Sequence, residues 1–129
     1  MRIAPDLLAQ IVEHARQEAP NECCGLVAMR DDAAVSVHPT ENVAASPFRF
    51  EIDGRVMIGL LDELEDAGVA PGLIYHSHTR SEAYPSQTDI NFAAGWPGWQ
   101  WLIVGLAGGG LEVRCFAIED GVVEELALE

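Results

Sequence analysis

The sequence contains no lysine, and all seven of its basic residues are arginine. Aspartate and glutamate number 21, so the formal net charge is −14 at pH 7. A surface this negative repels phosphate backbones and anionic lipid headgroups. The composition therefore argues against nucleic acid and membranes as partners, and it favours a partner protein with a neutral or basic face.

Cysteines and long apolar runs are also scarce. Three cysteines without a CxxC spacing do not make a disulfide framework, and their odd number fits a reducing compartment. No stretch approaches the ~20 apolar residues that span a bilayer, and the first ten residues lack the features of a signal peptide. We therefore expect a cytoplasmic protein. A length of 129 residues predicts one domain, residues 1–129.

Hydrophobic periodicity predicts three helices that alternate with strands. Apolar residues at helical spacing predict a first helix that begins near Pro5 and ends before Pro20. A second helix is expected from the N-cap Asp53 to Gly68, and a third near residue 89. His14 and His38 are expected to be exposed. The expected strands are Cys24–Met29, Ala34–His38, a short one at Phe48–Ile52, Gly72–Tyr75, Trp99–Ala107, Leu111–Ile118 and Val122–Leu128.

Turn residues set the expected directions of these strands. Asp31-Asp32, the glycine run at 108–110 and Asp120-Gly121 are typical of hairpin connections, which join antiparallel strands. No lysine and no helix start follow the glycine run, so it is not a phosphate loop. Helices alternating with a mostly antiparallel sheet indicate the α/β class, arranged as an α/β/α sandwich.

The stretch from Tyr75 to Phe92 has the richest chemistry. His76 and His78 end an apolar strand and lie two residues apart, so both imidazoles leave the sheet on one face. Asp89 follows eleven positions after His78. Two histidines and a carboxylate are the three protein ligands of a catalytic zinc site, in which water takes the fourth position. As alternatives, the histidines are ordinary polar residues at a strand end, and Ser86-x-x-Asp89 is a helix capping box.

Other chemistries find less support. The helical H-E-x-x-H of many zinc proteases is absent, and so are the H-x-E and P-C-x-x-C elements of zinc deaminases. Cys23 and Cys24 precede an apolar segment, which favours packing at a strand start. A nucleophilic cysteine with a distant histidine stays an alternative, because nothing near the pair marks a partner.

Taken together, Glu22, His76-Ser77-His78, Ser86 and Asp89 resemble the JAMM motif of MPN-domain metalloproteases, which reads Glu, His-Ser/Thr-His, Ser-x-x-Asp. The resemblance extends in pieces from about residue 20 to 94. The segment HSHTRSEAYPSQTD is most similar to the small bacterial members that act on sulfur-carrier proteins. The resemblance implies the cytidine-deaminase-like MPN (JAB/MPN) fold, with a mostly antiparallel mixed sheet.

The resemblance also implies a role for each motif residue. His76, His78 and Asp89 would hold Zn²⁺, and Glu22 would be the proton shuttle between the attacking water and the leaving amine. Ser86 would stabilise the oxyanion. Considered alone, Glu22 reads as a solvated turn acid; only the downstream ligands give it a catalytic role.

The implied reaction is hydrolysis of the bond after the C-terminal Gly-Gly of a ubiquitin-like sulfur carrier. This releases a new cysteine for biosynthesis or trims the carrier tail. The alternatives are a general deconjugase of ubiquitin-like modifiers and a non-catalytic MPN scaffold, although scaffolds usually lose ligands that this chain keeps. A homodimer stays open, and so does the role of Arg80, which either pairs with a substrate carboxylate or is an exposed loop residue.

Overall fold

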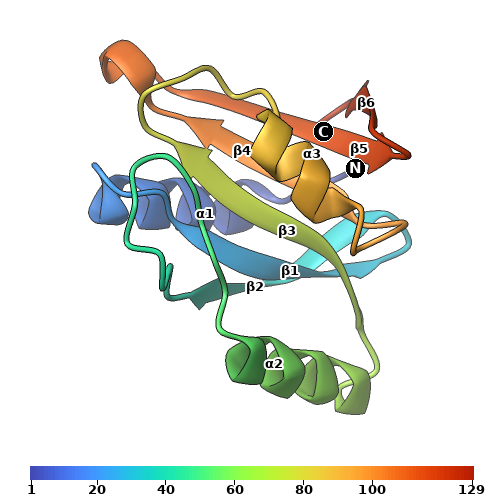
Figure 1. The fold of residues 1–129 in the computed structure, drawn as a ribbon. Helices are drawn as coiled ribbons and strands as arrows, with labels where there is room; N and C mark the ends of the chain where they lie inside the picture. The colour runs from blue at the N-terminus through green and yellow to red at the C-terminus, as the bar shows by residue number, and fades with distance from the viewer.

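The computed structural model describes residues 1–129 as one six-stranded sheet with three α-helices (Figure 1). The strands lie in the order β2-β1-β3-β4-β5-β6, and only the β3–β4 pair is parallel. None of the helices has the length and apolar content that a membrane crossing needs. In chain order the elements are α1 (Pro5–Glu18), β1 (Cys24–Arg30), β2 (Ala33–Thr40), α2 (Gly54–Asp66), β3 (Ala70–His78), α3 (Gln87–Ala93), β4 (Gln100–Gly105), the 3₁₀ turn η1 (Ala107–Gly109), β5 (Glu112–Glu119) and β6 (Val122–Leu126).

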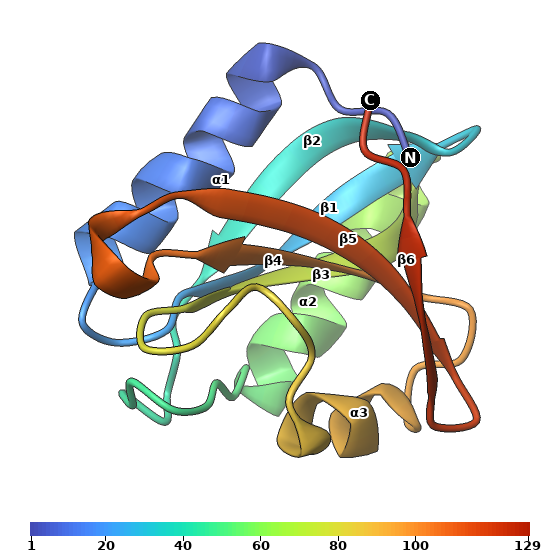
Figure 2. The same ribbon diagram turned by 90° about the horizontal axis from the view of Figure 1, so that it is seen from above.

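The helices cover both faces of the sheet, with α1 on one side and α2 and α3 on the other (Figure 2). Alternate residues of the central strands supply the two cores. Leu73 and Tyr75 of β3 pack with Ile11 of α1, whereas Ile74 packs with Met57 of α2. The expected α/β/α sandwich with a mostly antiparallel mixed sheet is confirmed.

Local signals placed the helix ends and the turns correctly. Asp53 caps α2 by accepting hydrogen bonds from the amides of Arg55 and Val56, at 2.9 and 3.3 Å. Asp31 and Asp32 both have positive φ, 52° and 59°, which a two-residue hairpin turn of type I′ requires. The glycine run forms η1 and connects β4 to the antiparallel β5.

Three expectations were wrong. Phe48–Ile52 is not a strand, because the Asn42 side chain takes the place of a ladder partner. Its Nδ2 donates to the Arg49 carbonyl at 3.1 Å, and its Oδ1 accepts from the Glu51 amide at 3.0 Å. His14 is not exposed, because its ring packs against Tyr75 with Nδ1 2.7 Å from the hydroxyl oxygen; only 12% of its side chain is accessible. His38 is half-buried and not exposed, and its Nε2 lies 2.8 Å from Ser36 Oγ on the same strand.

Candidate metal centre

The centre lies where β3 ends on the face of the sheet that α2 and α3 cover. His76 and His78 are 0% and 4% exposed, and both rings project toward this face. Asp89 in the first turn of α3 is 5% exposed and meets them there. Three groups that prefer water are thus buried together, which costs free energy unless they satisfy one another or a bound ion.

The potential ligand atoms of these residues converge. His76 Nε2 and His78 Nε2 are 3.3 Å apart, and each lies 3.1 Å from Asp89 Oδ2. Tetrahedral zinc, with bonds of about 2.0–2.1 Å to nitrogen and oxygen, separates its ligand atoms by about 3.3 Å. The donor set and its spacing therefore fit zinc.

Asp89 is oriented by the start of α3. The Ser86 side chain accepts from the Asp89 amide at 3.1 Å, and the Ser86 amide donates to Asp89 Oδ2 at 2.9 Å, which completes a capping box. Burial alone would raise the pKa of Asp89, but both histidines and the Ser86 amide outweigh burial and hold that pKa well below its usual range. The capping and metal-ligand interpretations of this segment are compatible, because one carboxylate oxygen serves both.

The two imidazoles are held differently. His78 Nδ1 lies 2.8 Å from the carbonyl oxygen of Glu82. Because a carbonyl only accepts hydrogen bonds, Nδ1 carries the ring proton, and the lone pair of Nε2 is free to bind a metal. Burial lowers the pKa of His78, but hydrogen bonds to Asp89 and to this carbonyl, with the charges of Asp89 and Glu22, raise it overall. The His76 ring stacks on Phe50, with centroids 4.6 Å apart, and its Nδ1 has no hydrogen-bond partner.

Glu22 faces the same centre from the segment before β1. It is 3% exposed, and a carboxylate oxygen lies within 4.8 Å of ligand atoms of His76 and His78. Glu22 thus completes one set of three potential ligands with the two histidines, and Asp89, 3.1 Å from both histidines, completes another. Glu22 Oε1 is buried without a partner. Burial raises the pKa of Glu22 to about 8, the positive charge of His78 opposes the rise, and Asp89 adds to it.

The backbone of Glu22 is fixed by the loop that follows β2. Its amide donates to the Ser46 carbonyl, and its carbonyl accepts from Asn42 Nδ2, both at 2.9 Å. In addition, the Cys23 amide donates to Ser77 Oγ of β3 at 2.8 Å. These three bonds hold the carboxylate beside the histidine strand.

Ser86 and Arg80 are exposed residues on the segment between His78 and α3. Ser86 Oγ accepts a hydrogen bond in its capping role, so its own hydroxyl proton remains available for donation. Arg80 lies over the ring of Phe48, with its Cζ 5.3 Å from the centroid, and it forms no ion pair.

The cysteines take no part in the centre. Cys23 and Cys24 are 1% and 0% exposed, and burial raises the pKa of their thiols to about 12 and about 11. Cys24 Sγ lies 3.3 Å from Thr40 Oγ1. Neutral, enclosed thiols are poor nucleophiles, so packing is the role that the structure supports.

Sequence reasoning missed the residues that support the site. Asn42 and the Glu82 carbonyl belong to irregular segments without a periodic pattern, and Phe50 lies in a segment whose pattern predicted a strand and not a loop. Ser77 was seen only as a motif residue, and its hydrogen bond to the Cys23 amide was not foreseen. The alternation of β3 does place Ser77 on the face opposite the histidines, but no spacing in the sequence names its partner.

Comparisons with known proteins show which family this chain resembles. Residues 4–118 match a family described as prokaryotic homologs of the JAB domain. The CysO-cysteine peptidase of Mycobacterium tuberculosis is 36% identical over 126 residues, which cover 95% of this chain and 86% of the relative. A desampylase of Haloferax volcanii is 38% identical over 110 residues, covering 80% and 78%. The crystal structure of a JAB1/MPN domain protein from Archaeoglobus fulgidus superposes with a TM-score of 0.66 at 21% identity, covering 100% of this chain and 97% of that one.

Proposed function

This chain belongs to the JAB/MPN peptidase family, and we propose that it is a zinc-dependent enzyme that hydrolyses the bond after the C-terminal Gly-Gly of a ubiquitin-like sulfur-carrier protein. The convergence of His76, His78 and Asp89 within 3.3 Å, with the unpartnered Oε1 of Glu22 buried beside them, is the observation that carries the proposal. A scaffold would have no need to bury these four groups together.

Each residue has one task in the proposed mechanism. His76, His78 and Asp89 would hold zinc, which would act as a Lewis acid toward the scissile carbonyl and lower the pKa of a water to about 7. Glu22 accepts the proton of the attacking water and returns it to the leaving nitrogen. Its raised pKa, about 8, is near neutrality, where a carboxyl group both gains and loses a proton at low cost. The Ser86 hydroxyl donates a hydrogen bond to the carbonyl oxygen as negative charge develops there.

The substrate class is supported by the relatives and by charge. One relative is named a CysO-cysteine peptidase and another a desampylase. Both names support cleavage of a conjugate of a ubiquitin-like carrier protein. A net charge of −14 favours a carrier that presents a neutral or basic face. Release of cysteine from such a carrier would serve cysteine biosynthesis in the cytoplasm.

Metal analysis tests the site. We expect about one zinc per purified chain, and its loss when His76, His78 or Asp89 is replaced by alanine, because an open three-ligand site has no ligand to spare. His38→Ala is the matched control, since His38 lies on β2 and contacts Ser36 instead. Full zinc content in all three ligand variants would refute the site.

Mass spectrometry tests the substrate. We expect a ubiquitin-like carrier ending in Gly-Gly-Cys to lose its cysteine, whereas an unrelated folded protein and a free dipeptide stay intact. The similarity to the desampylase favours a second candidate, a deconjugase, so the same carrier joined to a lysine side chain should be compared. Faster cleavage of the lysine conjugate would select the deconjugase, and equal cleavage of every substrate would indicate a general peptidase.

A further inference from the structure

We propose that Glu112 is a positioning residue for the metal ligand His78, and that it acts through the peptide group between Glu82 and Ala83. The inference rests on the proposed metal site. It assigns a role to a carboxylate on β5, on the far side of β4 from His78, that belongs to no motif in the sequence.

Two hydrogen bonds meet on one peptide group. Glu112 Oε1 accepts from the Ala83 amide at 3.0 Å, and the Glu82 carbonyl accepts from His78 Nδ1, 2.8 Å away. The amide of Ala83 and the carbonyl of Glu82 belong to the same planar unit. Hydrogen bonds therefore connect the Glu112 carboxylate through the peptide group to the imidazole of His78, whose Nε2 faces Asp89.

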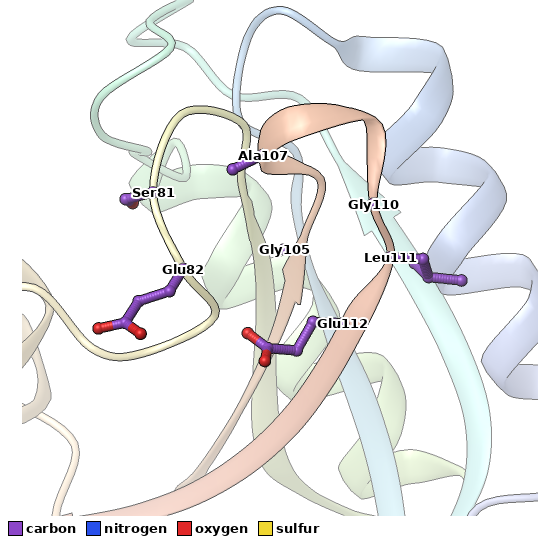
Figure 3. Close-up of a pocket in the computed structure, with 7 residues that line it drawn as sticks. All are labelled: Ser81, Glu82, Gly105, Ala107, Gly110, Leu111 and Glu112. Atoms are coloured by element: carbon purple, nitrogen blue, oxygen red, sulfur yellow. The ribbon is translucent and has the colours of Figure 1, made fainter.

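The sheet places the two ends of this series of hydrogen bonds in one row. His78 of β3 pairs with Gly105 of β4, and Gly105 pairs with Glu112 of β5. Residues in register across neighbouring strands project from the same face of the sheet. Figure 3 shows the Glu112 side chain extending from β5 toward the loop that carries Glu82, beside a cavity of about 320 Å³.

Gly105 makes room for the peptide group between these residues. A Cβ at Gly105 would lie 3.1 Å from both the Cβ and the amide nitrogen of Ala83, closer than ordinary packing allows. Ala83 itself is fully buried. The absence of a side chain in the middle of the row thus lets the loop pass directly over β4 and reach both neighbours.

This series of hydrogen bonds resembles a carboxylate–histidine pair in which a peptide group lies between the carboxylate and the imidazole. A carboxylate that accepts a hydrogen bond from a peptide N–H polarises that peptide group, so the carbonyl of the same peptide becomes a stronger hydrogen-bond acceptor. A stronger acceptor at Nδ1 holds the proton there, fixes the ring and makes Nε2 a better metal ligand. Glu112 would therefore act on zinc affinity without contacting the metal.

The loop has other contacts that survive the loss of Glu112. Arg114 lies over the Tyr84 ring at 5.6 Å, and Phe116 packs edge-on against that ring with centroids 5.4 Å apart. Both come from the same face of β5. Replacement of Glu112 should therefore remove one hydrogen bond and its charge, while the loop keeps its place.

The first test is zinc affinity, measured by competition with a chelating dye. Loss of a group that orients a ligand histidine typically weakens metal binding 10–100-fold. Because Glu112 acts through a peptide, we expect about tenfold weaker binding for Glu112→Ala. Glu112→Gln keeps a hydrogen-bond acceptor but loses the charge, so its zinc affinity should lie between those of Glu112→Ala and the wild type. Glu124→Ala, an exposed carboxylate of β6, is the control and should bind zinc normally.

The second test needs no metal. In the metal-free protein, nitrogen-15 NMR should show the His78 ring protonated at Nδ1, and Glu112→Ala should shift the ring toward a mixture of tautomers. Unchanged His78 signals and unchanged zinc affinity in Glu112→Ala would overturn the proposal, whatever happened to thermal stability. A wild-type protein that binds no zinc would refute the proposed function instead, and the NMR result would still decide the role of Glu112.

Discussion

Replacement of Glu22 by glutamine separates catalysis from metal binding. The amide has nearly the shape of the carboxylate, and Asp89 lies 3.1 Å from both histidines, so we expect the fold and the zinc content to be retained. A glutamine amide cannot accept and return a proton. General acid–base catalysis contributes roughly 10²–10⁴-fold, and single-turnover cleavage should slow by a factor in that range.

The same substitution has a second consequence, for stability in the metal-free protein. Glu22 has a pKa of about 8 in the folded protein against a reference value of 4.5, so between these values the folded state holds a proton that the unfolded state has released. Stability from this group is present below pH 4.5 and is lost as pH rises toward 8. Since one pH unit corresponds to at most about 1.4 kcal/mol, the loss between pH 5 and pH 7 is about 2 kcal/mol.

Urea unfolding with a chelator present measures this effect. The free energy of unfolding of Glu22→Gln relative to wild type should rise by about 2 kcal/mol from pH 5 to pH 7, while the other titrating groups cancel in the difference. Glu41→Gln, which removes an exposed carboxylate, is the matched control. Wild-type turnover by a zinc-loaded Glu22→Gln would refute the proton-shuttle assignment, and a flat pH difference would refute the buried, protonated carboxyl.

The remaining predictions concern Ser86 and Gly25. Ser86→Ala should keep zinc, but its single-turnover rate should fall by about 10²–10³-fold because the oxyanion loses a hydrogen-bond donor. Its free energy of unfolding should fall by about 1 kcal/mol because α3 loses its N-cap. An unchanged rate would show that Ser86 acts only as a helix cap. Gly25→Ala should cost about 1–3 kcal/mol in urea unfolding, because its Cβ would lie 2.4 Å from a Tyr75 ring carbon. Gly59→Ala in α2, where the new methyl meets nothing within 4 Å, is the control and should stabilise instead.

Much of the centre was predictable because its signals are local. The alternation of a strand puts His76 and His78 on one face whatever the rest of the chain does. The capping box of α3 joins Ser86 to Asp89 within a single helical turn. Helix ends, such as the Asp53 cap, depend in the same way on residues a few positions apart. For these features the order of residue types in the chain was sufficient.

The position of Glu22 was decided by tertiary structure. It reaches the histidines because β1 pairs with β3 so that Cys24 lies opposite His76, and no spacing in the sequence encodes that pairing. From the sequence its role came only through a family resemblance. The raised pKa, a consequence of burial, could not be read from a turn glutamate.

Phe50 and Glu112 mark the limit of the local signals. The first was expected in a strand and instead stacks on His76 from an irregular loop. The second lies at the start of a strand, and only the His78–Gly105–Glu112 row brings it to the loop that holds His78. Strand order and register come from many weak contacts summed over the whole chain, so residues that meet through them become neighbours only when the chain has folded.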